Sequence, residues 1–359
     1  HQLIATFGKK RIQIAVIITS FIIGLALFFE VGLVVLLPII FVIAREVNMP
    51  LLYLGIPMAA TLNVAHGFLP PHPAPTAVSQ VLNAPLGHVL LIGILVSIPT
   101  IIISGPVFNY FLHRVYPQVY KKDINISVLG EYKEFELKDT PKFGIIVLTA
   151  LIPVILISIA TILSFVLPAK SVIYQIVTFI GAPDVAMLIS LIVAIFTMGI
   201  FRGLNIKEIG DAMSESVKQI AMMLLIIGGG GAFKQVLVDG GVSKYIGDLF
   251  GQTNLSPILV AWLIAALLRV SLGSSTVASI TAASLVTSVV SNSSVSSVLV
   301  VLAIGAGSIF ADHVNDAGFW MIKEYFGLTL KETFLSWTTL TSVISVSGLL
   351  SILLVSCFM

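Results

Sequence analysis

Two charged side chains stand alone inside apolar stretches of this 359-residue chain: Glu30 in LALFFEVG and Arg269 in ALLRVSLG. An ionised side chain at the centre of a membrane helix costs roughly 2.5–3.5 kcal/mol, so such residues usually face a protein interior and mark a substrate or ion path. A guanidinium can bind both oxygens of a carboxylate. We therefore predict that Arg269 binds an anionic substrate and that Glu30 carries a proton. A structural salt bridge between these two residues is the alternative.

A run of small hydroxylated residues, SLGSSTVAS, directly follows Arg269. Ser274, Ser275 and Thr276 could begin the second half of a broken helix, whose free N–H groups and positive dipole end would attract an anion. We predict that these three residues bind substrate beside Arg269. Small residues that only allow close helix packing are the alternative.

A proline-rich segment, HGFLPPHPAPT at residues 66–76, interrupts two apolar stretches and contains His66 and His72. Backbone groups without hydrogen-bond partners cannot face lipid, so a break at this depth must be buried in protein or line a wet cavity. Imidazole groups titrate near neutral pH. Both histidines are predicted to contact substrate or a proton, and an exposed loop with solvated histidines is the alternative.

A second polar cluster, FADHVNDAGFW at residues 310–320, ends a glycine-rich apolar segment. It contains Asp312, His313, Asn315 and Asp316. We predict that His313, Asn315 and Asp316 hydrogen-bond a polyhydroxy substrate or relay protons. A solvated turn is the alternative for this cluster, at least for one of its aspartates.

The composition indicates which kind of element positions these residues. Of the chain, 57% is hydrophobic and only 10% is charged. Soluble domains carry about 25% charged residues. Several apolar runs reach or approach the roughly 20 residues that span a bilayer, so we predict an all-α polytopic membrane protein. These runs include 12–29, 143–167, 186–201 and 335–359.

The remaining features narrow the function. The net charge of +2 is scattered, which gives no indication of nucleic-acid binding, and the single cysteine excludes an internal disulfide or a CxxC metal site. The sequence has no HExxH motif and no nucleotide-binding loop, so we expect no metal, no cofactor and no ATP-driven step. The Lys9-Lys10-Arg11 cluster predicts a cytoplasmic location for the first end of the apolar run that follows it.

The pattern of breaks predicts two related halves. The run 12–44 is too long for one crossing, so breaks are expected at Glu30–Gly32 and at Pro38, and four glycines, Gly228 to Gly231, predict a further break or hinge near Lys234. Paired interrupted segments are typical of transporter sites near the membrane midplane. We expect a first repeat at 1–112, a polar loop at 113–142 and a second half at 143–359 that contains the second repeat. The paired segments are 25–32 with 266–273, 48–68 with 293–319, and 83–97 with 328–342.

Five long motifs resemble the gluconate permease family of bacterial inner-membrane gluconate:proton symporters, and the similarity covers the whole chain. They are FFEVGLVVLLPIIFVIA, HGFLPPHPAPTA, MMLLIIGGGGAFKQVLVDGGV, LRVSLGSSTVASITA and the stretch from DHVNDAGFW to the SW at 336–337. The resemblance implies ion-transporter-superfamily-like inverted repeats with broken helices or re-entrant hairpins, and a dozen or so spans. Because members of the family usually begin with about two further membrane segments, the resemblance implies that such segments precede His1 and that the first repeat is incomplete here. The start at His-Gln without Met is typical of a processed or truncated chain.

The resemblance also implies a function: proton-coupled import of a sugar acid, with gluconate favoured by the GGGGAFKQ and DHVNDAGFW motifs. D-serine or another small carboxylate is the alternative within the family. A passive channel, or an intramembrane serine hydrolase that uses Ser274 with His313, represents the other classes. The implied partners are the sugar acid anion, protons and the lipid of a bacterial inner membrane, and a homo-oligomer is compatible with the sequence.

Overall fold

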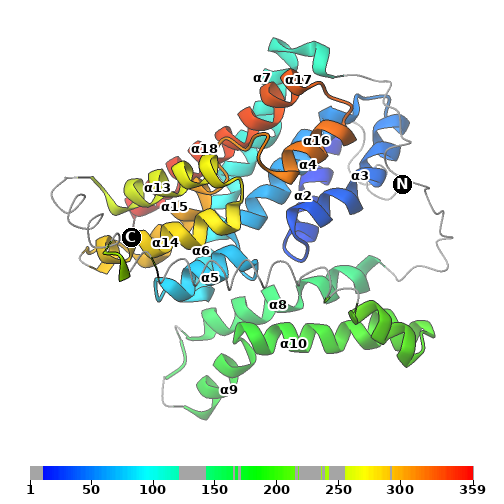
Figure 1. The fold of residues 1–359 in the computed structure, drawn as a ribbon. Helices are drawn as coiled ribbons and strands as arrows, with labels where there is room; N and C mark the ends of the chain where they lie inside the picture. Colours follow the sequence, from blue (N-terminus) through cyan, green and yellow to red (C-terminus); the bar gives the residue numbers. More distant parts are fainter. Residues whose placement is uncertain are drawn as a thin grey trace. The chain divides into compact units, whose positions relative to one another are not determined.

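The computed structural model describes residues 11–120, 143–164, 166–168, 171–214, 255–291 and 293–358, with positions 217, 236 and 239–241. These residues form helices and contain no strand, which confirms the predicted all-α class. The chain divides into two compact units (Figure 1): unit 1 takes its residues from 1–132 and 233–359, and unit 2 from 133–232. The four-glycine segment with Lys234, and residues 121–142 of the polar loop, lie outside the described residues.

Unit 1 is built from two series of helices. The first series contains α2 (Ile12–Gly24), α3 (Phe29–Glu46), α4 (Leu51–Phe68), α5 (Pro73–Val81), α6 (Leu86–Ile102), the π-helix η2 (Ile103–Val107), α7 (Phe108–Val115) and the 3-10 helix η3 (Pro117–Val119). The second contains α13 (Pro257–Leu272), α14 (Ser275–Ser291), α15 (Ser297–Gly307), α16 (Ala317–Tyr325), α17 (Leu330–Thr333), the π-helix η8 (Phe334–Thr338) and α18 (Thr339–Ser356).

Unit 2 contains α8 (Phe143–Ser164), α9 (Val172–Ile180), α10 (Pro183–Ala194), the π-helix η6 (Ile195–Gly199) and the 3-10 helix η7 (Ile200–Arg202). Helix α8 packs against both α9 and α10. Within this packing, the Ser190 hydroxyl donates to the Thr149 carbonyl at 3.1 Å, which satisfies a polar group that lipid could not.

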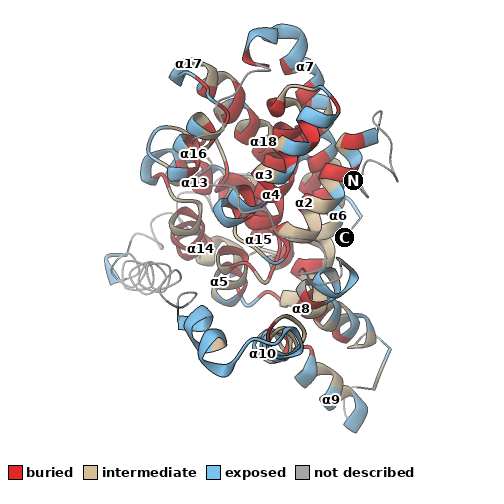
Figure 2. Cartoon of the chain, turned by 90° about the vertical axis from the view of Figure 1, so that its right-hand side faces the viewer, coloured by how far each residue is buried: buried red, intermediate tan, exposed pale blue. Residues whose placement is uncertain are grey.

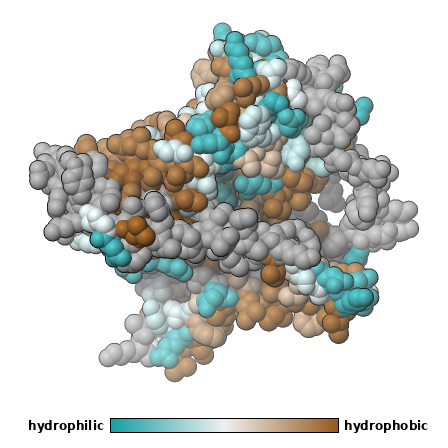
Figure 3. Space-filling view, viewed as in Figure 1, coloured by the Kyte–Doolittle hydropathy of each residue, from teal (hydrophilic) through white to brown (hydrophobic). Residues whose placement is uncertain are grey.

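Four stretches of helix among the described residues are long and apolar enough to cross a membrane. They are Leu51–Val81, Leu86–Val115, Asp184–Arg202 and Leu330–Ser356. Large apolar side chains on the outside are expected for a protein surrounded by lipid, and Leu263 and Leu267 of α13 are exposed. In Figure 3 hydrophobic residues cover the region of α13 and α18, while hydrophilic residues gather near α7 and α17.

Helices α4 and α15 form the centre of unit 1, and nearly all their residues are buried (Figure 2). They cross at two glycines, because a Cβ on Gly305 would collide with the Gly67 carbonyl oxygen. Such small residues let membrane helices approach closely. Elsewhere hydroxyl groups bond to their own helix: the Ser97 hydroxyl donates to the Gly93 carbonyl at 2.7 Å.

The helix breaks were located only partly by the sequence. The first break lies at residues 25–28, just before Glu30 rather than at Glu30–Gly32, and α3 continues through Pro38. The proline-rich segment breaks as predicted, at 69–72 between α4 and α5. Further breaks separate α13 from α14 at Gly273 and α15 from α16 at 308–316. These breaks position the candidate site.

Candidate functional site

A pocket of about 300 Å³, which includes its opening to solvent, lies where several helices of unit 1 end or begin. Its lining comes from the starts of α3 and α14, the last two turns of α4, the last turn of α13, and the break between α15 and α16. Helix ends leave backbone N–H and C=O groups without partners, so their convergence gives a polar interior among apolar helices. The lining residues are Phe29, Glu30, Asn63, His66, Arg269, Ser275, Ile309, Asp312 and Asp316.

Arg269 is the cation of this pocket and is 4% exposed. It lies in the last turn of α13, where a positive charge is favoured by the helix dipole. Its Nη2 lies 3.0 Å from Asp312 Oδ1 and its Nη1 lies 2.7 Å from Asp316 Oδ2, while Nη1 also donates to the Gly273 carbonyl. The buried Nε–H has no protein partner. Arg269 therefore keeps its Nε–H free for a bound molecule.

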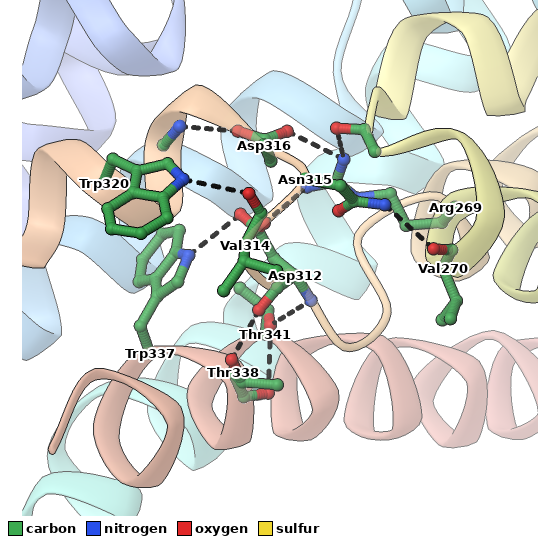
Figure 4. A network of polar contacts seen from close by, with 12 residues as sticks. Arg269, Val270, Asp312, Val314, Asn315, Asp316, Trp320, Trp337, Thr338 and Thr341 are labelled. Carbon is green, nitrogen blue, oxygen red and sulfur yellow. Dashed lines mark hydrogen bonds and ion pairs between the residues drawn. The ribbon is translucent and has the colours of Figure 1, made fainter. Parts of the chain in front are cut away.

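Asp312 is held rigidly on one side of Arg269 (Figure 4). The indole N–H of Trp337 donates to Asp312 Oδ2 at 2.8 Å. The backbone N–H of Asp312 donates to the Thr341 hydroxyl at 3.0 Å, and the Thr338 hydroxyl donates to the backbone carbonyl of Asp312 at 2.6 Å. Trp337 lies on η8, and a π-helical turn within a longer helix often occurs at a functional site. Asp312 is thus a fixed partner of the guanidinium.

Asp316 approaches Arg269 from the N-cap position of α16, where its Oδ1 accepts from the Gly318 N–H at 2.5 Å. It is 17% exposed, compared with 4% for Asp312. Asn315 lies beside it, exposed, and donates from its amide to the Val270 carbonyl at 2.9 Å. This bond ties the 308–316 break to the end of α13, so Asn315 positions the site rather than lining it.

Glu30 lies in the first turn of α3, where the helix dipole favours a carboxylate, and it lines the pocket while remaining exposed. The salt bridge with Arg269 that the sequence left open is not the pairing found, since Arg269 pairs with Asp312 and Asp316. The neighbouring Phe29 ring stacks on Trp337, with centroids 5.2 Å apart. This stacking fixes the start of α3 next to the Asp312 network.

Both histidines of the proline-rich segment are buried, so the exposed-loop alternative is wrong for them. His66 lies in the last turn of α4 and lines the pocket, and its Nδ1 has no protein partner. The His72 ring lies 5.2 Å from that of His66 but is not part of the lining. His72 Nε2 donates to the Gly24 carbonyl at 2.6 Å and so caps the end of α2 before the first break.

The other predicted residues lie around the pocket rather than in it. Ser275 begins α14 and lines the pocket, whereas Ser274 and Thr276 do not. The Ser274 hydroxyl, just before α14, accepts from the Val277 N–H of its first turn at 3.4 Å. His313 follows Asp312 without lining the pocket, and its buried Nδ1 has no partner. The structure therefore brings together Glu30, His66, Arg269, Ser275 and Asp316.

Asn63, Asp312 and Trp337 were not among the predicted site residues. Asn63 lies three residues before His66 on α4, which is the spacing of one helix face, so a polar residue at that distance was a usable signal. Asp312 was noticed as part of its polar cluster, but nothing in the sequence ranked it above Asp316. No local pattern could reveal Trp337, since 25 positions separate it from Asp312.

Chemically, the arrangement suits binding of a small carboxylate with hydroxyl groups. It offers a guanidinium, a free imidazole nitrogen, a serine and an asparagine, together with three carboxylates that can accept protons. Among the described residues, no three His, Cys, Asp or Glu side chains are grouped so that they could hold a metal ion.

Residues 1–358 match the family described as GntP family permease. The chain belongs to this permease family. It is 59% identical over 352 residues to an uncharacterized permease, YojA, of Bacillus subtilis strain 168, covering 98% of this chain and 79% of that protein. It is 54% identical to the gluconate permease of the same strain, covering 99% of this chain and 80% of that protein. It is 47% identical to the Gnt-II system L-idonate transporter of Escherichia coli K12, covering 99% and 79%.

Membership makes the permease a membrane transport protein and not an enzyme. The hydrolase alternative is therefore wrong. The predicted resemblance to the gluconate permease family is confirmed.

Proposed function

We propose that the permease imports gluconate, or a closely related sugar acid, together with a proton across the bacterial inner membrane. The observation that carries this proposal is the buried Arg269 in a pocket that also presents hydroxyl and amide groups. Gluconate and L-idonate, the substrates in the names of two relatives, are both polyhydroxy carboxylates. A guanidinium for the carboxylate and neutral polar groups for the hydroxyls match that substrate class.

In this proposal Arg269 and the start of α14, with Ser275 nearest, bind the carboxylate. Asn63 and His66 contact the polyol, while Asp316 meets the polyol or the proton. His72, Ser274, Thr276, His313 and Asn315 support these groups from outside the lining. Glu30 takes up the proton, because it is the most exposed of the three carboxylates that line the pocket.

Proton coupling is electrically favourable for an anion. Entry of one negative charge into a cell with a negative interior costs roughly 2.3 kcal/mol for each 100 mV of membrane potential. One accompanying proton cancels that cost, and each unit of pH gradient contributes about 1.4 kcal/mol of driving force.

The proposal also includes two repeats of opposite orientation that move about the pocket. The first repeat lies in 1–112, the second lies within the second half, 143–359, and the polar loop 113–142 joins the halves. The two helix series of unit 1 have the same order of elements: a helix, a break, two helices, a second break, a short helix and a long one. In the same positions of the two series, α2 packs on α4 and α13 packs on α15. Transporters with repeats of this kind bind substrate where the halves meet.

The test is uptake of labelled gluconate into proteoliposomes with an acidic exterior. Accumulation above the equilibrium level is expected for the wild type, and uptake that never exceeds equilibrium would instead indicate a passive channel. Competition by unlabelled L-idonate and D-serine separates a sugar acid permease from one for another small carboxylate. Glu30→Gln should abolish acid-driven accumulation and preserve gluconate counterflow; accumulation equal to that of the wild type would remove Glu30 from the mechanism.

A further inference from the structure

The pocket contains more carboxylates than its cation can pair. Arg269 is the one permanently charged cation among the lining residues, and Glu30, Asp312 and Asp316 are the carboxylates. Both terminal nitrogens of the guanidinium are already occupied, one by each aspartate. An incoming carboxylate would meet two anions at the group that should bind it. The Nε–H is free, but a substrate carboxylate can replace an aspartate on a terminal nitrogen only if that aspartate leaves Arg269 or becomes neutral.

The two aspartates differ in how firmly they are held. Asp312 has Trp337 on its second oxygen, and two threonines fix its backbone. Asp316 has Arg269 on one oxygen and the start of its own helix on the other, and it is the more exposed of the two. Movement of the Asp316 side chain breaks one ion pair and a helix-cap hydrogen bond at a partly exposed position, whereas movement of the Asp312 side chain also leaves the buried indole N–H of Trp337 without its acceptor.

Given the proposed function, we propose that Asp316 is the internal counter-ion that substrate replaces. The substrate carboxylate takes the place of Asp316 Oδ2 on Arg269 Nη1, and the displaced Asp316 carboxylate binds the transported proton as a carboxylic acid. One anion and one proton enter together, so the net charge of the pocket is unchanged. Asp312 remains on Nη2 and is a positioning residue for the guanidinium.

The surrounding charges couple the two events. Asp316 faces Arg269 from α13, Glu30 from α3, His66 from α4 and Asp312 from its own connection. Substrate removes Asp316 from its only ion pair, and the proton neutralises the carboxylate that is left beside Glu30 and Asp312. Proton and substrate therefore strengthen each other's binding by the same factor, as linkage requires.

The experiment measures equilibrium gluconate affinity of the purified full chain between pH 5 and pH 9, with counterflow in proteoliposomes. The wild type should lose affinity as pH rises, at most about tenfold per unit for one linked proton. Asp316→Asn cannot bind a proton but keeps the helix cap, since Asn caps as well as Asp. This variant should bind gluconate with an affinity that does not change with pH, retain counterflow, and lose accumulation driven by the pH gradient.

Three further variants make the test decisive. Asp316→Ser, another neutral cap, should behave as Asp316→Asn does. Asp312→Asn should weaken binding by a similar factor at every pH and keep the slope, and Glu30→Gln should keep the slope because Glu30 delivers the proton without competing for Arg269. A retained slope in both folded Asp316 variants, or loss of their binding altogether, overturns the proposal for Asp316. A wild type with no affinity for gluconate, or no dependence on pH, overturns the proposed function instead.

Discussion

At the residue scale, the pocket depends on how one buried guanidinium is shared. Arg269 is paired with two aspartates and still has an unpartnered Nε–H. Removal of one partner from a buried ion pair typically costs 3–5 kcal/mol, because the remaining charge is left without compensation. Loss of the arginine should therefore affect both the stability of the fold and the binding of an anion.

Arg269→Gln should weaken gluconate binding by about 100-fold or more, since a bidentate charged partner is lost. Unfolding in detergent should also occur at a lower temperature. Binding titration and thermal unfolding would measure the two effects. Arg45→Gln is the matched control, because Arg45 is an exposed arginine at the end of α3, and it should change neither quantity. An unaltered affinity in Arg269→Gln would remove this residue from the binding site.

Trp337→Phe keeps the ring that stacks on Phe29 but removes the N–H that Asp312 accepts. An unsatisfied buried acceptor costs about 1–3 kcal/mol, so the free energy of unfolding should fall by that amount and gluconate affinity by roughly fivefold to tenfold. Trp320→Phe provides the comparison, because that exposed indole donates to the Val314 carbonyl outside the pocket. Equal behaviour of the two variants would contradict the positioning role of Trp337.

At the element scale, the site exists because helices stop inside the unit. Gly273 ends α13 with φ +75°, a left-handed conformation that glycine adopts without strain, and Ala311 has φ +49° just before Asp312. A Cβ on Gly273 would collide with the backbone of Asn315. The two breaks therefore pack on each other and set the distance between Arg269 and its aspartates.

Gly273→Ala should lower the free energy of unfolding by about 2 kcal/mol or more, as the left-handed backbone alone costs an L-residue roughly 1–2 kcal/mol. Gluconate transport should fall in parallel, because the collision lies beside the Arg269 network. Gly105→Ala is the control, since its Cβ would meet ordinary contacts beginning at 3.6 Å. Chemical denaturation and counterflow would be measured for both variants, and similar stability of the two would argue against a tight break.

At the scale of the whole molecule, the question is how charge crosses the membrane. The two central helices α4 and α15 are almost wholly buried, and apolar residues cover much of the outside. A pocket inside such a structure cannot take up an uncompensated anion cheaply, because low-dielectric surroundings strengthen every charge interaction. A joint passage of anion and proton avoids that cost.

Transport of one gluconate with one proton should be electrically neutral. A pH gradient should drive accumulation in proteoliposomes, whereas a potassium diffusion potential of either sign at equal pH should change the initial rate little. Internal radiolabel and external pH, followed together, give the ratio of the two species. Strong stimulation by an interior-negative potential would indicate more than one proton per anion.

The sequence alone determined the class of the molecule, because hydrocarbon admits few structures: long apolar runs must be helices, and charges among them must face protein. For this reason Glu30, Arg269 and the proline break at 69–72 could be recognised as special from composition and local chemistry. The family was likewise recognisable from long motifs.

Tertiary structure decided which of these residues meet. The pairing of Arg269 with Asp312 and Asp316 instead of Glu30, the role of Trp337, and the exclusion of His72 from the pocket lining all depend on how breaks from distant segments pack. A one-dimensional pattern records the spacing along a helix but not the angle or depth at which two helices cross. At the crossing of α4 and α15 those quantities are set by contact between glycines 238 positions apart, Gly67 and Gly305, which no local rule predicts.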